Sequence, residues 1–403
     1  MKKVFALILA LALCLTAAVS VSLADGVAKE DIKIGVILLH DEDSTYGNNF
    51  IVGVKDAAAL LGLSEDQVII KRNIPESEAC KEAALDLVDE GCTIIFADSF
   101  GHEDFMISAA QECPEGEFCH ATGTKAHTAG LPNFHNAFAA IYEGRYLAGV
   151  AAGLKLNQLR DEGKLKGDVP MIGYVGAFTY AEVMSGYTSF YLGAKSVCPD
   201  VIMKVQFTGS WYDEMGEKTA AQALIDMGCD LISQHADSMG APTACENANI
   251  PNISYNGSTV ASCPNTFIVA SRIDWAPYFE YIVNQKIAGE PIATDWTGTI
   301  ATGSVKLTDV NEQAAAPGTV EKLAEIQAQF EAGTLHVYDT AAEGFITVGG
   351  EPLTSYTADV DTDEAFTPDT EVVADGYFHE SEFRSEPYFD VQIDGIELLN
   401  SAF

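Results

Sequence analysis

Apolar runs and amphipathic stretches alternate along most of this chain. The apolar runs at residues 32–39 and 93–97 are short and bounded by turn residues, which is typical of buried β-strands. The stretches that follow them repeat their apolar positions with the period of an α-helix. The pattern predicts strands at 32–39, 68–70, 93–97, 170–175, 201–207 and 230–234, and helices at 48–61, 76–90, 103–111, 181–197 and 214–228. It therefore indicates an α/β protein with two doubly wound, Rossmann-like lobes built on parallel sheets.

The order of the later segments predicts that the two lobes are joined by a hinge. Residues 266–271 and 276–287 resemble a strand and a helix, and we interpret both as a return of the chain to the first lobe. The expected division is lobe 1 at residues 25–136 and 270–298, lobe 2 at 137–269 and 299–340, and an acidic C-terminal extension at 341–403. Thr, Asp, Glu and Gly dominate that extension, and its strand-like pieces are short.

The first 24 residues have the pattern of a secretory signal peptide. Two lysines precede an apolar run at residues 4–21, and small residues stand three and one positions before Asp25. We expect cleavage before Asp25 and a location outside the cytoplasm, in the periplasm or at the outer face of the plasma membrane. An anchoring helix is the alternative, because the run is near the lower limit for crossing a bilayer. Leu13 precedes Cys14 where a lipoprotein would have a small residue, so the sequence does not support a lipid anchor.

Composition excludes several classes of partner and cofactor. The 403 residues include 22 Lys+Arg and 59 Asp+Glu, which gives a formal net charge of −37. Because a surface this acidic repels phosphate backbones and anionic membranes, we expect no nucleic-acid partner. There is no P-loop, GxGxxG, HExxH or CxxC pattern, so neither a cofactor nor a metal ion is predicted. Eight cysteines follow the leader, and both disulfides and buried free thiols remain open for them.

Polar and aromatic residues gather after the predicted strands, where open α/β sheets bind their ligands. Tyr46 follows the first strand of lobe 1, and Trp211 follows the strand at 201–207 in lobe 2. If the lobes close, one ring from each side can stack on a flat heteroaromatic ligand, and each face contributes about 1–3 kcal/mol. Four carboxylates and amides at the same rim are placed to bind the edge of that ligand: Asp43, Asp213, Asp237 and Asn256. Packing at the edge of each lobe is the alternative role for the two rings.

A hydrolase is the alternative that the residues around Ser99 raise. The sequence Ala-Asp-Ser-Phe-Gly at 97–101 differs from the nucleophile elbow GxSxG at its first glycine. Spacing alone ties no Asp/His pair to Ser99, so no catalytic residue is predicted.

Three motifs resemble those of a known family. The sequence Tyr-Glu-Gly-Arg-Tyr-Leu-Ala-Gly at 142–149 resembles the EGxYLAG signature of the basic membrane protein family, the PnrA-like solute-binding proteins of ABC importers. Gly-Tyr-Val-Gly at 173–176 and Gly-Ser-Trp-Tyr-Asp at 209–213 resemble two further motifs of that family, and the resemblance runs from about residue 32 to about 308. It implies a type I periplasmic-binding-protein fold that delivers a purine nucleoside or base to ABC permease subunits. A ligand-sensing receptor domain for a signalling system is the runner-up.

The resemblance also implies roles for individual residues. It gives Asp43 and Tyr46 the acidic and stacking roles of the first loop, and Trp211 the opposing stack. Ser99 and Phe100 match a loop that lines the family's pocket. The implied ligand-binding residues are Asp43, Tyr46, Ser99, Phe100, Thr122, Gly123, Phe178, Trp211, Asp213, Asp237 and Asn256.

Two departures from the family pattern concern the ligand. The nucleoside binders of the family have an Asp where this chain has Asn256 and a Lys a little further on, which is missing near residues 271–274. Where the family has another acidic residue before a glycine, this chain has Thr122 before Gly123. Without the Asp/Lys pair a ribose loses charge-assisted hydrogen bonds, each worth roughly 1.5–3 kcal/mol. The departures favour a free purine base such as adenine.

Overall fold

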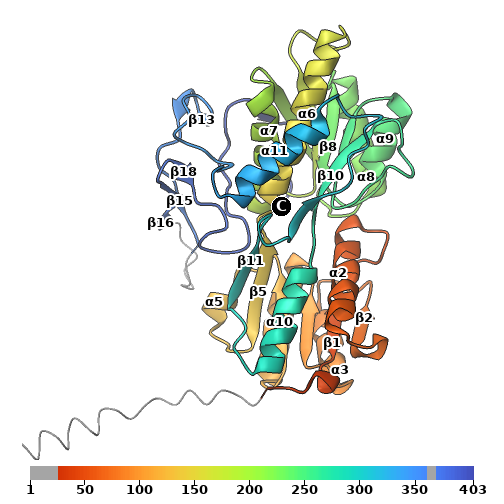
Figure 1. Ribbon diagram of the computed structural model, residues 1–403, viewed down its shortest axis with the longest axis vertical. Coiled ribbons are helices and arrows are strands. Elements are labelled where there is room, and N and C mark those ends of the chain that lie inside the picture. Colours follow the sequence, from red (N-terminus) through yellow and green to blue (C-terminus); the bar gives the residue numbers. More distant parts are fainter. Residues whose placement is uncertain (1–25, 361–368) are drawn as a thin grey trace, which may run out of the picture.

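The computed structural model describes residues 26–360 and 369–403, which form two α/β lobes stacked along the long axis of the molecule (Figure 1). The sheet of lobe 1 has the strand order β11-β5-β4-β3-β1-β2, and all of its pairs are parallel. Its strands are β1 (Ile34–Ile37), β2 (Val68–Lys71), β3 (Ile94–Ala97), β4 (Glu117–Ala121), β5 (Phe134–Ala139) and β11 (Asp295–Gly298). The helices of this lobe are α2 (Thr45–Leu61), α3 (Glu78–Asp89), α4 (Glu103–Glu112), α5 (Ala126–Ala129) and α10 (Ala276–Ala288).

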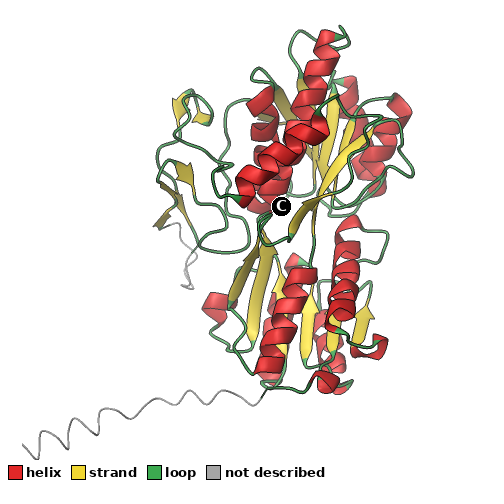
Figure 2. Cartoon of the chain, viewed as in Figure 1, coloured by secondary structure: helices red, strands yellow, loops and turns green. Residues whose placement is uncertain are grey.

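The sheet of lobe 2 has the order β12-β10-β9-β8-β6-β7-β19 and is parallel except for the β10–β12 pair. Its strands are β6 (Met171–Gly176), β7 (Ile202–Phe207), β8 (Leu231–His235), β9 (Asn252–Tyr255), β10 (Phe267–Ile273), β12 (Val305–Leu307) and β19 (Ile396–Leu398). Its helices are α6 (Ile141–Asp161), α7 (Ala181–Val197), α8 (Glu214–Asp226), α9 (Gly240–Ala248) and α11 (Thr319–Glu331). Helices flank each sheet (Figure 2). The predicted α/β class with two parallel-sheet lobes is therefore confirmed.

One predicted element lies in the other lobe. Strand β10 pairs with β9 and β12, so the interpretation of residues 266–271 as a return to the first lobe is wrong. Nearly every residue of β10 is buried, as in the central strands of either sheet. The sequence of such an apolar strand therefore does not indicate which of the two sheets it joins. The return begins only with α10, which packs on α2 where Gly53 lets the chain at Trp275 approach closely.

Small residues bring helices α6 and α7 into close contact. A Cβ at Gly149 would lie 2.0 Å from the carbonyl oxygen of Phe190, and one at Gly193 would lie 2.0 Å from that of Tyr146. Gly149 of the signature segment and Gly193 of α7 thus serve packing, because no side chain fits between the two backbones.

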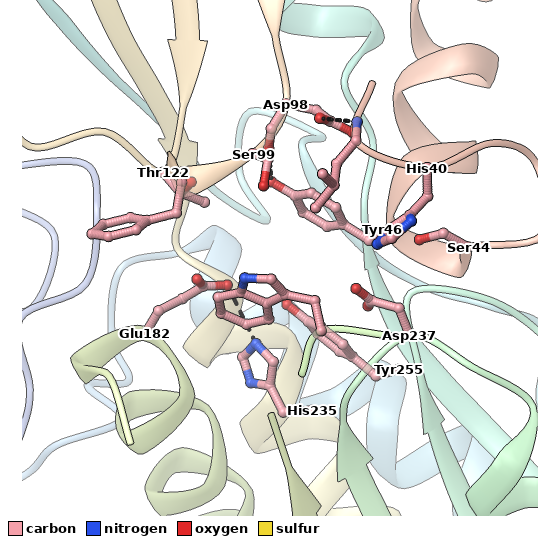
Figure 3. Close-up of a pocket in the computed structure, with 13 residues that line it drawn as sticks. His40, Ser44, Tyr46, Asp98, Ser99, Thr122, Glu182, His235, Asp237 and Tyr255 are labelled. Carbon is pink, nitrogen blue, oxygen red and sulfur yellow. Dashed lines mark hydrogen bonds and ion pairs between the residues drawn. The ribbon is translucent and has the colours of Figure 1, made fainter. Parts of the chain in front are cut away.

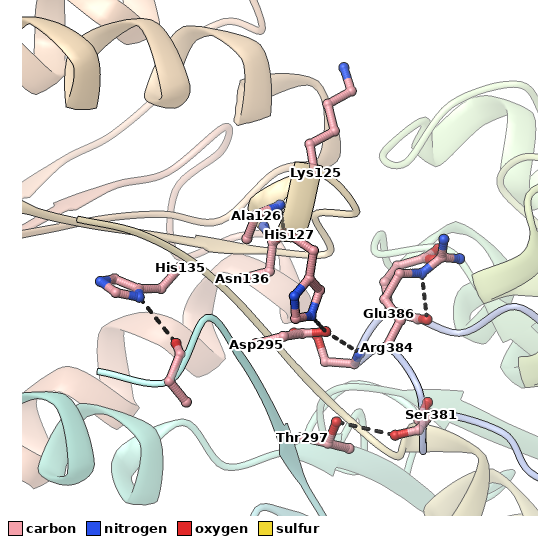
Figure 4. A network of polar contacts seen from close by, with 12 residues as sticks. Lys125, Ala126, His127, His135, Asn136, Asp295, Thr297, Ser381, Arg384 and Glu386 are labelled. Carbon is pink, nitrogen blue, oxygen red and sulfur yellow. Dashed lines mark hydrogen bonds and ion pairs between the residues drawn. The ribbon is translucent and has the colours of Figure 1, made fainter. Parts of the chain in front are cut away.

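The C-terminal residues are packed onto both lobes. Strand β19 extends the second sheet beside β7, and three short antiparallel strand pairs precede it: β13 (Thr347–Val348) with β14 (Glu351–Pro352), β15 (Thr357–Ala358) with β16 (Thr370–Glu371), and β17 (Val373–Ala374) with β18 (Tyr377–Phe378). On the lobe 1 side, the backbone N–H of Ser385 donates to Asp295 Oδ2 at 2.7 Å, and Thr297 donates to the carbonyl of Ser381 (Figure 4). Phe389 in this region is fully buried, which the acidic composition did not indicate.

The structure also shows the state of the cysteines and the character of the helices. The eight cysteines of the described chain are free thiols, and all but Cys113 are buried. In the same residues, none of the helices has both the length and the apolar character that a membrane span needs. The expected signal peptide at 1–24 lies outside the described residues.

Candidate ligand-binding site

A cavity lies between the lobes, at the carboxyl ends of the strands of both sheets (Figure 3). That is the edge at which open α/β sheets bind ligands. Lobe 1 contributes Leu39, His40, Ser44, Tyr46, Asp98, Ser99, Phe100 and Thr122, and lobe 2 contributes Glu182, Trp211, His235, Asp237 and Tyr255.

The lobes touch each other around this cavity. The backbone N–H and the hydroxyl of Thr45 both lie 3.3 Å from the carbonyl oxygen of Asp237, to which they donate. Asn49 Nδ2 donates to the carbonyl oxygen of Asn256 at 3.1 Å. At the mouth, the rings of Phe100 and Tyr180 have centroids 5.6 Å apart. The structure is therefore that of the closed protein.

The aromatic residues predicted from each lobe line the same cavity and are supported by their own lobe. The ring of Tyr46 packs edge-on against Phe50 with centroids 4.9 Å apart. Trp211 packs edge-on against Phe178 at 5.1 Å, and Phe178 in turn stacks on Tyr180 at 5.0 Å. Phe178 thus stands behind Trp211 and supports it, and it does not itself line the cavity.

Of the predicted site residues, the structure places six on the cavity wall: Tyr46, Ser99, Phe100, Thr122, Trp211 and Asp237. Asp43 and Asp213 lie away from it and are exposed. Asp213 caps helix α8 by accepting the Gly216 N–H at 2.9 Å, which is a common use for an Asp that precedes a helix. Gly123 serves packing, since a Cβ there would lie 2.0 Å from Asn136 Nδ2.

Thr122 and Asn256 both have left-handed backbones, with φ of +64° and +61°. This conformation is unfavourable for a β-branched residue such as Thr122, and strain of this kind gathers at functional sites. Asn256 directly follows the wall residue Tyr255 and is not itself on the wall, and its Oδ1 lies 3.3 Å from the donating Asn49 Nδ2. The amide oxygen of Asn256 thus helps to hold the lobes together.

Three buried carboxyl groups face the cavity. Burial raises the pKa of Asp98 to about 7 even though its side chain accepts the Leu39 N–H, and burial raises the pKa of Asp237 well above its usual value. Burial raises the pKa of Glu182 to about 8. The wall contains neither Lys nor Arg. A phosphorylated ligand would therefore meet acidic groups and no cation, which makes an anionic ligand unfavourable.

Sequence reasoning missed Glu182 and Tyr255. Glu182 lies in the first turn of α7 and Tyr255 is the last residue of β9, whereas the predictions were drawn from the loops after the strands. Asp98 and His235 fell within such loops but were not singled out. The signal for Glu182 was available, because an acidic residue opening a helix that follows a strand lies at the ligand edge of the sheet.

The surroundings of Ser99 do not form a nucleophilic pair. Its hydroxyl donates to Glu76 Oε1 at 2.6 Å, and His120 contacts its backbone carbonyl at 2.7 Å. No hydrogen bond in the described chain joins the Ser99 hydroxyl to a histidine. The surroundings of Ser99 therefore differ from the serine–histidine pair that the hydrolase alternative assumes.

Comparison with known proteins gives a family match and relatives whose names differ in ligand; a putative ABC transporter glucose-binding protein of Haloferax volcanii, for example, is 32% identical over 210 residues, or 52% of this chain and 50% of the relative. The family model described as "ABC transporter substrate-binding protein PnrA-like" matches residues 34–332. A purine-binding protein of Brucella abortus (strain 2308) is 32% identical over 316 residues, which cover 77% of this chain and 84% of the relative. The nucleoside-binding protein BmpA of Lactococcus lactis subsp. cremoris is 29% identical over 154 residues, or 38% of this chain and 39% of the relative.

Among solved structures, a solute-binding protein of an ABC transporter system from Aeropyrum pernix K1 aligns with a TM-score of 0.63 and 16% identity. The alignment covers 78% of this chain and 94% of that one. It shows that the fold is that of the two-lobed solute-binding proteins, as expected from the sequence motifs.

Proposed function

Because this chain belongs to the PnrA-like family of ABC transporter substrate-binding proteins, we propose that its interlobe cavity binds a purine base and presents it to a permease. The family assignment made from the motifs at 142–149, 173–176 and 209–213 is confirmed, and with it the role of a substrate-binding protein of an ABC transporter. The family is extracytoplasmic. The purine ligand, the permease subunits as partner and the cleaved signal peptide at 1–24 are parts of the proposal.

One observation carries the choice of ligand. Tyr46 from lobe 1 and Trp211 from lobe 2 line one cavity whose wall contains no Lys or Arg. Two rings from opposite sides suit a planar, uncharged ring system, because stacking contributes about 1–3 kcal/mol per face. The Brucella abortus relative is a purine-binding protein by name, which supports the same choice.

The surroundings of Asn256 support a free base over a nucleoside. Asn256 stands where the nucleoside binders of the family have an Asp, and its Oδ1 and backbone carbonyl both face Asn49 Nδ2. It has no charge to offer a ribose hydroxyl. Ribose binding would thus lack charge-assisted hydrogen bonds worth roughly 1.5–3 kcal/mol each.

Binding works through closure of the lobes. A ligand held by Tyr46 and Trp211 together touches both lobes only when they are closed, so it shifts the population toward the closed state. The contacts of Thr45 with Asp237 accompany that state. The permease then distinguishes the loaded protein by its closed shape. The receptor-domain alternative shares this mechanism, and the family assignment favours the transporter.

Calorimetric titration of the purified protein tests the proposal. We expect saturable binding of adenine or another free purine base, at least tenfold weaker binding of the matching nucleoside, and no binding of the nucleotide. Trp211→Ala should weaken base binding by at least tenfold, whereas Met215→Ala, at an exposed position on α8, should not. Tight binding of a sugar with no purine bound would overturn the proposal, and unchanged affinity in Trp211→Ala would remove the stacking argument.

A further inference from the structure

Glu182 and His235 form a buried pair on the lobe 2 wall of the cavity. His235 Nε2 lies 3.3 Å from Glu182 Oε1, and both side chains are almost completely buried (Figure 3). Glu182 comes from the first turn of α7, and His235 is the last residue of β8. Both residues lie at the carboxyl-terminal edge of the lobe 2 sheet, where the cavity is. Neither takes part in the proposed stacking by Tyr46 and Trp211.

The surroundings of His235 determine which of its nitrogens carries a proton. Burial and the nearby Arg145 lower the pKa of His235 well below its usual value, so the ring is neutral and has one N–H. Nδ1 has no hydrogen-bond partner and faces Gly186, where even a Cβ would lie only 2.4 Å away. A buried N–H without an acceptor costs more than an unused lone pair, so the proton belongs on Nε2. Glu182 Oε1 therefore accepts a hydrogen bond from His235.

Among the described residues, no cation is seen to stabilise a negative charge on Glu182. The titratable groups that face it from the neighbouring elements are Tyr46, Tyr174, His235, Asp237, Tyr255 and Glu386. None of them is positively charged near neutral pH. Arg145 lies over the ring of Tyr255 at 5.3 Å, and its hydrogen bonds go to neutral groups such as Tyr174 and Ser233. A carboxyl in such a place takes up a proton, because burial penalises only its charged form.

The two oxygens of Glu182 then have different tasks. Oε1 is engaged by the donating His235 Nε2, which leaves the acidic proton to Oε2 of this cavity-lining residue. We propose that Glu182 binds the ligand as a neutral carboxylic acid, donating from Oε2 to a ring nitrogen and accepting a neighbouring N–H. This selects heteroaromatic rings in which an acceptor nitrogen stands beside an N–H donor, as in free purine bases. The inference rests on the proposed function, because it assigns a role within the same cavity.

Two substitutions distinguish a neutral from an ionised Glu182. Gln has one donor group and one acceptor group and is always neutral, so Glu182→Gln should bind adenine within about threefold of the unmodified protein at pH 6.5. Glu182→Ala has neither group and should lose at least tenfold. Circular dichroism and thermal unfolding of both variants check that the fold is intact. Glu143→Gln neutralises another buried carboxyl outside the cavity and should leave affinity unchanged.

The pH profile of the unmodified protein needs no variant. Affinity for adenine should fall above pH 8, whereas Glu182→Gln should lack this fall and retain only the pH dependence that Asp98 and Asp237 on the same wall contribute. If Glu182→Gln loses as much affinity as Glu182→Ala, or if the unmodified protein binds more tightly above pH 8, the proposal of a neutral Glu182 is overturned. The proposal of a purine ligand then still stands. If the unmodified protein binds no purine at any pH, both proposals fall together.

Discussion

The hydroxyl of Tyr46 donates a 2.8 Å hydrogen bond to the backbone carbonyl oxygen of Asp98. Tyr46 lies near the start of α2, and Asp98 directly follows β3, so this bond ties two neighbouring ligand-edge segments of lobe 1 together. The side chain of Asp98 in turn accepts the Leu39 N–H at 2.9 Å. The ring that lobe 1 offers to the ligand is thus held in place from both sides, by this bond and by Phe50.

Substitutions at Tyr46 separate the ring from its hydroxyl. Tyr46→Phe retains the stacking face and loses one neutral hydrogen bond, which is worth about 0.5–1.5 kcal/mol, so purine affinity should fall only a few fold. Tyr46→Ala also removes the stacking face, worth about 1–3 kcal/mol more, and should lose ten- to a hundredfold. Calorimetric titration measures both. Equal losses in the two variants would show that Tyr46 contributes through the hydroxyl bond to Asp98 and not through the stacking face of its ring.

The sequence predicted the elements well because strand and helix patterns are local. Each βα unit of the lobes carries its own period and turn residues, and those elements lie close to the predicted bounds. Sheet membership is not local, which is why β10 was assigned to the wrong lobe. The same limit applies to the site. Asp213 is a residue type common in binding sites, but it caps α8. Glu182 has the sequence context of an ordinary helical residue, but it faces the cavity.

Arg145 is a fully buried cation in the signature segment, and its removal should be costly. Its guanidinium donates to five acceptors: Tyr174 Oη, Ser233 Oγ, Ser271 Oγ and the carbonyl oxygens of Gln234 and Ser254. The ammonium of a lysine cannot reach all of them, and each buried acceptor left unsatisfied costs about 1–3 kcal/mol. Arg145→Lys should therefore lower the free energy of unfolding by about 3 kcal/mol or more in urea titrations.

Arg160→Lys is the matched control, since Arg160 forms an exposed ion pair with Asp200 at 2.5 Å. Exposed pairs contribute about 0–1 kcal/mol, so this variant should unfold almost like the unmodified protein. A similar small effect of both substitutions would mean that the Arg145 network adds little to stability.

The buried carboxyl groups make stability depend on pH. Burial raises the pKa of Glu143 and Glu217 to about 7 and the pKa of Glu182 and Glu380 to about 8, above the usual value of 4.5. In the unfolded chain these groups ionise near pH 4.5, so between pH 4.5 and 8 the folded protein holds more protons. The free energy of unfolding then falls as pH rises, by up to about 1.4 kcal/mol per pH unit for each retained proton.

Buried histidines have the opposite effect on the free energy of unfolding, but only at lower pH. Burial lowers the pKa of His102 and His120 to about 4, so they reduce stability as pH falls below 6.5. We therefore expect the melting temperature to fall steadily from pH 6.5 to pH 8, as measured by scanning calorimetry. Glu143→Gln should flatten that slope. A melting temperature that rises over this interval would contradict the prediction.

The last residues of the chain support the aromatic wall of the cavity. The backbone N–H of Thr179 donates to the carbonyl oxygen of Ala402 at 2.7 Å, and the N–H of Ala402 donates to Thr179 Oγ1 at 2.9 Å. Thr179 lies between Phe178 and Tyr180, and Phe178 supports Trp211. The C-terminal end is thus connected to the stacking ring through one short loop.

Truncation after Gly395 removes β19 and both of these bonds. It also leaves the edge of β7 unpaired, so the melting temperature should fall by several degrees. Purine affinity should weaken by about three- to tenfold, because the loop that supports Trp211 loses its anchor. Glu397→Gln removes only the exposed ion pair of β19 with Lys204 and should change neither quantity measurably. A truncated chain that melts earlier yet binds purine with full affinity would show that β19 stabilises the lobe without positioning the site.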